Sequence, residues 1–249
     1  MIVITYNPRE YWNKRIKSQP NLRGTGHIAF NETYNSYLYR LKILALEKAL
    51  NNYSIDIKGK SVLDVGSGTG FFINYYDMNG AKEICGIDIA EASISLLNKK
   101  YPKHSFQTID IGTHDINIKK QFDIINVFDI LYHIVDNRLF ENAIYNISNL
   151  LCSDAYVLIT DVFGENDLVP ADHVRFRNLH KYEILLKKNK IDIIDVLPLY
   201  NSMNRNIFHL PPLALNILTP ILYFVDSSLL KANVSSITNI KLLIGKKIK

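Results

Sequence analysis

Apolar residues recur along this chain with two different periods. Within residues 33–52 the spacing is three and four residues, which is the pattern of an amphipathic helix. Its apolar positions are Tyr34, Tyr37, Leu38, Leu41 and Ala45. From Ser61 onward, short apolar runs alternate with stretches of helical periodicity. We therefore expect one long helix first, followed by repeated strand and helix units.

The short apolar runs are expected to be strands, and they read VLDV, EICGID, SFQTID, FDIINVF, AYVLITD, IDIIDVL and IKLLIG. Helices are expected near 71–79, 91–100, 137–151 and 178–190. Strands that alternate with helices form βαβ units around a parallel sheet. The pattern predicts an α/β fold with a doubly wound, mostly parallel sheet and helices on both faces.

A chain of 249 residues suits one large α/β domain, so we expect a single domain over 1–249. Within it we expect an N-terminal helical lid (1–52), a core (60–199), an insertion (200–238), and a last strand with a basic tail (239–249). The insertion contains the apolar run 207–225, which is long enough to raise the question of a membrane span. Because prolines break helices, we expect no span there. A buried subdomain or a homodimer interface is expected instead.

Composition narrows the function only a little. The net charge of +5 favours an anionic partner, although lysine-rich usage alone can produce it. Cys85 and Cys152 have no partner at zinc-site or redox spacing, so neither a metal nor a disulfide is expected. The N-terminus shows no secretory signal pattern. A cytoplasmic location is therefore predicted.

A glycine-rich loop follows the first predicted strand and precedes a helix, in Asp64–Val65–Gly66–Ser67–Gly68–Thr69–Gly70. Glycine allows a tight turn and lets backbone N–H groups approach a ligand. A dinucleotide fingerprint requires glycine at position 71, where this chain has Phe71, and a Walker loop requires a Gly-Lys pair. The remaining pattern is an acid followed by three alternate glycines.

The run VLDVGSGTG resembles the first motif of class I S-adenosylmethionine-dependent methyltransferases, which have a Rossmann-like sheet. The resemblance is good over residues 60–165 and loose elsewhere. It implies S-adenosylmethionine as cofactor, S-adenosylhomocysteine as product, and Asp64, Gly66, Ser67, Gly68 and Gly70 around the cofactor.

The same resemblance assigns further cofactor positions at the ends of later strands. Asp88, with Ile89 beside it, would bind the ribose hydroxyls, or cap the helix that follows. Asp110 and Ile111 would contact the adenine, or Asp110 would form a turn. The remaining candidates are Val127 and Phe128 near the methionine moiety and, from the Tyr-Trp-x-x-Arg pattern of the N-terminal segment, Arg15 near the cofactor carboxylate.

Methyl transfer to a hydroxyl requires a base near the ends of the fourth and fifth strands. Candidates there are His133, Asp161 and His173. His133 has a suitable intrinsic pKa, but histidine at this position can also be structural. Asp161 can orient a base, bind a substrate hydroxyl, or cap a turn. His173 also fits a connector common in this superfamily.

The segment ADHVRFRN places His173, Arg175 and Arg177 on one side if it is extended. Two arginines on one face suit a phosphate or diphosphate, so both are candidate substrate-binding residues. Together with the resemblance, this predicts O-methylation of a small anionic acceptor, such as a nucleotide-linked sugar or another phosphorylated precursor of a bacterial surface polysaccharide.

Two other functions stay open. A lipid or quinone methyltransferase would use the 207–225 segment at a membrane surface. A catalytically silent cofactor-binding protein would share the same loop. Nucleic-acid methylation is not expected, because the fourth strand ends in NVFD rather than an Asn-Pro-Pro-aromatic motif.

Overall fold

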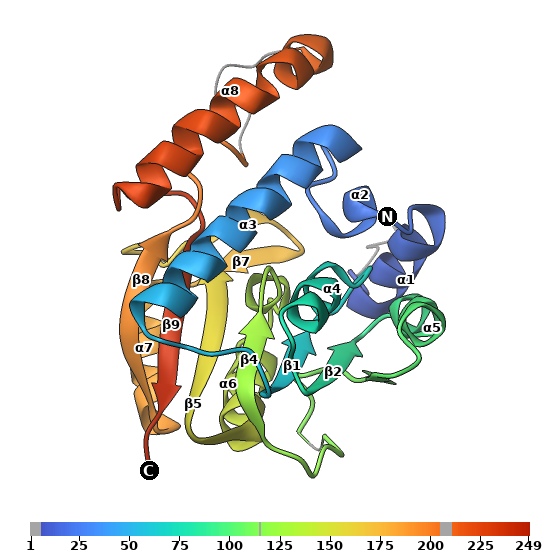
Figure 1. Cartoon of the computed structure of the whole chain (residues 1–249), viewed down its shortest axis with the longest axis vertical. Helices are drawn as coiled ribbons and strands as arrows, with labels where there is room; N and C mark the ends of the chain where they lie inside the picture. Colours follow the sequence, from blue (N-terminus) through green and yellow to red (C-terminus); the bar gives the residue numbers. More distant parts are fainter. Residues whose placement is uncertain (1–5, 115, 205–210) are drawn as a thin grey trace, which may run out of the picture.

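A central seven-stranded sheet organises the protein (Figure 1). The computed structural model describes residues 6–114, 116–204 and 211–249. The strands of the sheet are β1 (Ser61–Val65), β2 (Glu83–Asp88), β3 (Ser105–Thr108), β4 (Phe122–Val127), β5 (Leu151–Asp161), β8 (Ile191–Pro198) and β9 (Lys241–Lys247). The helices are α1 (Pro8–Ser18), α2 (Leu22–Thr25), α3 (Glu32–Asn52), α4 (Phe71–Met78), α5 (Glu91–Lys100), α6 (Asn137–Leu150), α7 (Leu179–Lys188) and α8 (Pro212–Lys231), with a 3-10 turn η1 (Leu131–His133).

The strand order is β3-β2-β1-β4-β5-β9-β8, and β9 alone runs antiparallel to its neighbours. Val62 in β1 lies between Ile84 of β2 and Ile124 of β4. The chain therefore winds outward from β1 in both directions. The predicted doubly wound, mostly parallel α/β sheet is confirmed.

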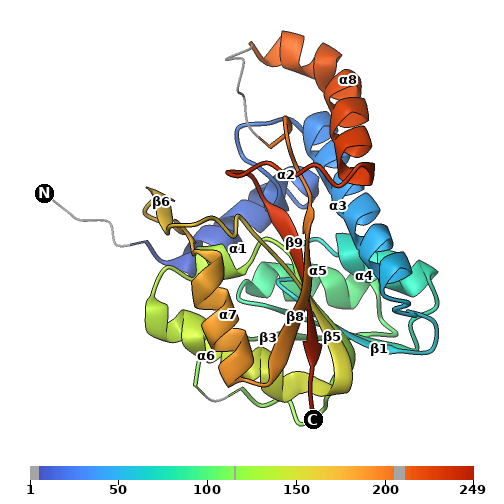
Figure 2. The same cartoon turned by 90° about the vertical axis from the view of Figure 1, so that its left-hand side faces the viewer.

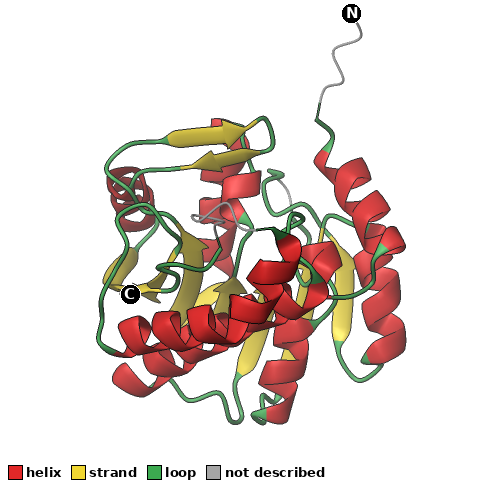
Figure 3. Ribbon diagram, turned by 90° about the horizontal axis from the view of Figure 1, so that it is seen from above, coloured by secondary structure: helices red, strands yellow, loops and turns green. Residues whose placement is uncertain are grey.

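Helices cover both faces of the sheet (Figure 3). Alternate strand residues point to opposite faces, so Val62 and Leu63 belong to different halves of the core. The half with Val62 packs against α3, α4 and α5, and the half with Leu63 packs against α6 and α7. Both faces of β1 are buried, which explains why its sequence is nearly continuous in apolar residues.

Side chains that accept backbone hydrogen bonds define where several helices begin. The Asp136 carboxylate accepts from the N–H groups of Arg138 (2.7 Å) and Leu139 (3.0 Å) at the start of α6. Asn31 and Asn178 do the same for α3 and α7. These contacts satisfy donors that have no partner inside the helix.

The predicted insertion contains α8, which lies alongside α3 (Figures 1 and 2). The expectation that prolines interrupt this segment was wrong, since α8 continues through Pro220. Pro211 and Pro212 occupy the helix start, where a missing N–H costs nothing.

One face of α8 is apolar and exposed. Leu213, Ile217, Ile221 and Phe224 are between 59% and 73% exposed. Within the described residues, Leu213–Lys231 is a helix that is long and apolar enough to cross a membrane, judged by length and composition alone. Because soluble proteins can also contain one helix with this length and composition, α8 alone is weak evidence for a membrane span.

A short hairpin of β6 (Leu168–Ala171) and β7 (Val174–Phe176) stands apart from the central sheet (Figure 3). The sequence pattern did not predict β6, although it suggested an extended segment at β7. In Figure 2, this hairpin lies toward α1. Ring contacts agree, since His173 lies 5.7 Å from Tyr11 between ring centroids.

Candidate cofactor and acceptor sites

The glycine loop connects β1 to α4 in a conformation that other residues rarely adopt. Gly66, Gly68 and Gly70 have φ angles of 77°, 51° and 84°. A Cβ at Gly66 would lie 1.9 Å from the Ile130 side chain, and one at Gly68 would lie 2.5 Å from that of Thr25. The glycines therefore provide both the turn and the space beside it.

Asp88, at the end of β2, fixes this loop. Its carboxylate accepts from the N–H of Gly68 (2.8 Å) and of Ala90 (2.8 Å). Burial raises the pKa of Asp88. The Ser93 hydroxyl and the Ile89 N–H oppose this rise, as do the N–H groups of Ala90 and Gly68. The alternative capping role is not confirmed, because the N-cap of α5 is Ala90 and no side chain caps that helix. The ribose role stays a prediction, and Asp88 lines the cavity described next.

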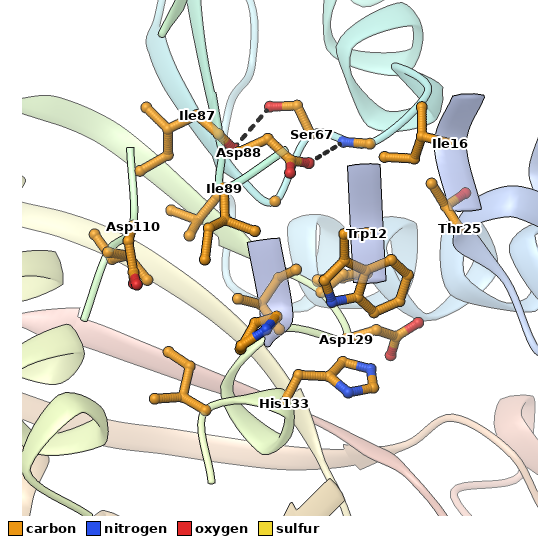
Figure 4. A pocket seen from close by; sticks show the side chains of 18 of the residues that line it. Trp12, Ile16, Thr25, Ser67, Ile87, Asp88, Ile89, Asp110, Asp129 and His133 are labelled. Carbon is orange, nitrogen blue, oxygen red and sulfur yellow. Dashed lines mark hydrogen bonds between the residues drawn. The ribbon is translucent and has the colours of Figure 1, made fainter. Parts of the chain in front are cut away.

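A cavity of about 310 Å³ lies against the loop (Figure 4). Most of the predicted cofactor residues line it, namely Gly66, Ser67, Gly68, Asp88, Ile89, Asp110, Ile111 and Phe128. Asp110 also forms the predicted turn, accepting from the N–H of Gly112 at 2.9 Å. Trp12 and Ile16 of α1 close the cavity from the N-terminal side. The cavity is thus lined jointly by the loop, the ends of β2 and β4, and the N-terminal segment.

Asp64 lies buried beneath the loop and outside the cavity lining. One of its oxygens accepts from the Asn126 amide at 2.7 Å, and Asn126 in turn accepts from the Tyr76 hydroxyl at 3.2 Å. Burial raises the pKa of Asp64 to about 7. Its other oxygen is buried without a hydrogen-bond partner. Asp64 therefore supports the glycine loop from below, and its predicted contact with the cofactor stays a prediction.

Three other predicted cofactor residues do not line this cavity. Val127 is fully buried in the core, and Gly70 packs against Leu97 and Tyr101. The Arg15 guanidinium donates to the carbonyls of Arg23 (3.1 Å) and Gly26. Arg15 therefore fastens α1 to the segment after α2, which corrects its predicted role as the partner of the cofactor carboxylate.

A second cavity of about 480 Å³ adjoins the first. It lies among α1, α3, the β6–β7 hairpin and the loops that follow β8 and precede β9. The residues common to both cavities are Trp12, Thr25, Tyr39, Lys42, Asp129 and His133. We call this set the junction. A ligand in one cavity would meet a ligand in the other at these side chains.

His133 presents an imidazole nitrogen at the junction. Its Nδ1 lies 3.0 Å from the backbone carbonyl oxygen of His173. A carbonyl only accepts, so Nδ1 carries the hydrogen and Nε2 has the free lone pair. Burial lowers the pKa of His133 to about 4. The ring is therefore neutral at physiological pH and able to accept a proton at Nε2.

The other two predicted catalytic residues are placed differently. His173 lines the second cavity, with its ring nearly parallel to that of His133 at 6.1 Å. Asp161 lines neither cavity. It is fully buried, accepting from the Tyr182 hydroxyl (2.5 Å) and from the Val162 N–H (2.6 Å). Its predicted catalytic role is corrected, because its oxygens hold β5 to α7.

The two arginines do not converge on one face. Arg177 is fully buried, and it donates to the carbonyls of Ile134 (2.8 Å) and Val135 (3.2 Å) in the loop before α6. Arg175 points elsewhere and pairs with Asp167 at 3.2 Å. Neither arginine lines either cavity. The predicted phosphate site is therefore corrected, since a buried guanidinium here satisfies backbone carbonyls.

The sequence analysis missed an ion pair at the junction. Lys42 of α3 pairs with Asp129, and their side chains are 4% and 21% exposed. Thr160 holds the other Asp129 oxygen at 3.0 Å, and Asp129 has a left-handed φ of 63°. Although burial opposes their charges, their mutual attraction lowers the pKa of Asp129 and raises that of Lys42. The sequence did carry one signal for this pair: Lys42 lies four residues from both Leu38 and Leu46, on the apolar face of α3.

The sequence model of a family described as a methyltransferase domain matches residues 34–195, which is well over half of the chain. This chain belongs to that methyltransferase family. A ribosomal protein L11 methyltransferase from Lactobacillus johnsonii is 31% identical over 112 residues, covering 42% of this chain and 34% of the relative. The chain therefore spans about a third of the length of that relative.

Solved structures agree with the fold of this methyltransferase. The N-methyltransferase NodS from Bradyrhizobium japonicum, with S-adenosylhomocysteine, has a TM-score of 0.61 at 12% identity, covering 96% of this chain and 100% of that one. Magnesium protoporphyrin IX methyltransferase from Synechocystis, also with S-adenosylhomocysteine, has a TM-score of 0.61 at 14% identity, covering 96% and 97%. Similarity at this identity concerns the fold.

The methyltransferase family match supports the predicted cofactor, S-adenosylmethionine, and two of the solved structures that share this fold contain that cofactor or its product. The site also fits this cofactor, through the glycine cradle and through Asp88 at the cavity wall. Among the described residues, no cluster of His, Cys, Asp and Glu could hold a metal ion.

Proposed function

We propose that this methyltransferase transfers the methyl group of S-adenosylmethionine to a hydroxyl oxygen of a small-molecule acceptor. The junction is the observation that carries the proposal. The cofactor cavity and a second cavity meet at a neutral histidine, next to Asp129, whose pKa is lowered by Lys42 against the effect of burial. A hydroxyl acceptor must lose a proton when it gains a methyl group, and this arrangement supplies an acceptor for that proton.

The cofactor, when bound, supplies a methyl group on a sulfonium that is open to in-line displacement. The chain's residues do the rest. The glycine loop and Asp88 hold the nucleoside, while Trp12 and Ile16 exclude water from the cavity. As the oxygen–carbon bond forms, His133 accepts the hydroxyl proton at Nε2. Asp129 stabilises the resulting imidazolium through its negative charge.

The finer prediction, a phosphorylated or nucleotide-linked sugar, now rests on the family resemblance alone. Arg175 and Arg177, which suggested the phosphate, are engaged elsewhere. The second cavity, of about 480 Å³, has the size of a small-molecule site, and this size favours a small molecule over a protein acceptor such as the name of the L11 methyltransferase relative gives. We therefore propose a small acceptor without assigning it a phosphate.

The exposed apolar face of α8 favours a second candidate, in which the methyltransferase works at a membrane surface on a lipid or quinone. Leu213, Ile217 and Phe224 would then enter the interfacial layer. Liposome flotation tests this, with a Leu213→Ser/Ile217→Ser/Phe224→Ser variant as control. If the wild type floats and the variant does not, the membrane candidate is supported. If the wild type does not float and sediments as a dimer, and the variant sediments as a monomer, α8 is a subunit interface.

The test of the proposed function is turnover of radiolabelled S-adenosylmethionine with a panel of hydroxyl and amine acceptors. We expect transfer to a hydroxyl, and we expect His133→Gln to lower kcat by about a hundredfold or more while S-adenosylhomocysteine still binds. Because the pKa of His133 is about 4, this residue should impose no decline in rate between pH 5.5 and 8. Transfer to amines alone, or full activity of His133→Gln, contradicts the proposal.

A further inference from the structure

We infer that the acceptor is an uncharged planar aromatic compound whose phenolic hydroxyl faces His133 at the junction. This inference rests on the proposed function and names its substrate class. It comes from the chemistry of the second cavity, which we call the acceptor cavity. Its lining is rich in aromatic rings, and several of its polar side chains are already bonded to the protein.

Aromatic rings surround the acceptor cavity on several sides. They are Tyr11, Trp12, Tyr39, Tyr132, His133, His173, Phe176 and Tyr200, and they come from α1, α3, η1, the β6–β7 hairpin and the end of β8. Tyr132 and Phe176 pack with centroids 5.0 Å apart, and Trp12 lies 5.1 Å from His133. Such rings bind a flat aromatic ligand by stacked or edge-on contact.

Two amide side chains in the described part of this lining, Asn35 and Asn239, are already hydrogen-bonded to the protein. Asn35 donates to the carbonyls of His27 (3.1 Å) and Phe30 (3.2 Å), and its oxygen accepts from the His27 N–H at 2.7 Å. Asn239 donates to two carbonyls of the 201–204 loop and accepts from the Ile240 N–H at 2.9 Å. A sugar with several hydroxyls would lose hydration here and find few replacements.

The charged side chains of the described lining are likewise paired. Arg15 binds the carbonyls of Arg23 and Gly26, and Lys42 binds Asp129. A phosphate in this cavity would have to break one of these contacts or remain without a counter-ion. Burying an unpaired charge is costly, so the lining disfavours an anionic acceptor.

The base also suits a phenol. His133 binds a proton weakly, since burial lowers its pKa to about 4. A phenolic hydroxyl has a pKa of about 10, as in tyrosine, whereas water and other very weak acids lie near 15.7. Proton transfer to His133 is therefore far less uphill from a phenol. The oxygen–methyl bond forms, the sulfur–methyl bond breaks and leaves a thioether, and the proton moves to His133.

Trp12 is the single tryptophan of the chain, and it lies at the junction, so fluorotryptophan labelling gives one reporter signal. We would follow it by fluorine NMR in protein saturated with S-adenosylhomocysteine. The probes are phenol, naphthol and anthrol, each beside its phosphate ester, with methyl glucoside as a non-aromatic control. We expect at least one phenol to bind at least about tenfold more tightly than its ester and than the glucoside.

Two ring variants separate the cavities. Phe176→Leu removes a ring that lines only the acceptor cavity, so it should weaken phenol binding severalfold and leave S-adenosylhomocysteine binding unchanged. Phe71→Leu removes a ring that lines only the cofactor cavity. It should weaken S-adenosylhomocysteine binding and leave phenol binding unchanged.

If S-adenosylhomocysteine binds but no phenol does, or an ester or the glucoside binds as tightly, the inference is overturned and the proposed function stands. If S-adenosylhomocysteine itself does not bind, the proposed function fails instead.

Discussion

The junction ion pair allows a quantitative prediction. Lys42→Met keeps most of the side-chain volume but leaves Asp129 enclosed without its cation. Removing one partner of a buried pair costs roughly 3–5 kcal/mol. Asp129 retains 21% exposure and can bind a proton, so we expect a smaller loss of about 2 kcal/mol in unfolding free energy at pH 7.

Urea denaturation of four proteins measures this effect: the wild type, Lys42→Met, Asp129→Asn and the double variant. The double variant should lose less than the two single losses combined, since it leaves neither charge unpaired. Lys48→Met is the matched control, because the ammonium of this second α3 lysine donates to the Leu230 carbonyl at 2.7 Å. It should cost less than about 1 kcal/mol.

The sign of the pH dependence follows from the pair. In the wild type, Lys42 lowers the pKa of Asp129. The stabilisation by the ion pair is therefore fully present above the ordinary pKa of 3.8 and is lost as pH falls from there through the lower pKa of the folded state. Without Lys42, burial raises the Asp129 pKa, and the variant's deficit should shrink as pH falls toward 5. Additive losses in the double variant, together with a pH-independent deficit, would refute the proposed coupling.

Three further predictions concern other parts of the chain. Arg177→Met should cost about 2–4 kcal/mol in urea unfolding by leaving buried carbonyls without a donor, and a loss within about 0.5 kcal/mol would contradict this. Burial raises the pKa of Asp161 to about 7, so the folded wild type binds a proton that the unfolded chain releases near pH 4. The free energy of unfolding of the wild type therefore falls as pH rises from about 4 through 7. Asp161→Asn should therefore gain about 1–3 kcal/mol over the wild type between pH 4 and pH 8, and a constant difference would contradict it. Gly68→Ala should weaken S-adenosylhomocysteine binding by about tenfold in calorimetry, because its Cβ meets Thr25 in a left-handed backbone; unchanged affinity would show that the loop adapts.

The fold and the cofactor loop could be predicted because they depend on local patterns. The strands around Val62 and Ile84 are apolar runs of strand length, and the glycines at 66, 68 and 70 satisfy a backbone requirement that few residues meet. Such signals lie within a few residues of one another. They define the element order and the ligand-facing loop without knowledge of distant contacts.

The roles of the charged residues could not be predicted in the same way, since they depend on long-range contacts. In the sequence, Arg177 has the features of a surface phosphate ligand. In the structure it follows β7 and lies beneath the loop before α6, where it donates to backbone carbonyls. Arg15 likewise has the sequence features of a cofactor ligand, but in the structure it donates to a carbonyl of α2. Lys42 and Asp129 are far apart in sequence and are paired only by the packing of α3 against the end of β4.

The helix α8 shows a different limit of sequence reasoning. Pro220 has a strong local tendency to interrupt a helix, yet α8 continues through it. Packing of Leu215 and Leu230 against the core holds the helix on both sides of the proline. Tertiary contacts outweighed local propensity here.

The cofactor site is tested most directly by isothermal titration of S-adenosylmethionine and S-adenosylhomocysteine into the wild type and Asp88→Ala. Asp77→Ala is the control, because Asp77 lies on α4 and pairs with Lys103 outside the cavity. We predict micromolar-range binding to the wild type and to the control, and binding at least about tenfold weaker to Asp88→Ala with its fold intact. Absence of binding to the wild type, or equal affinity in Asp88→Ala, would contradict the assigned cofactor site.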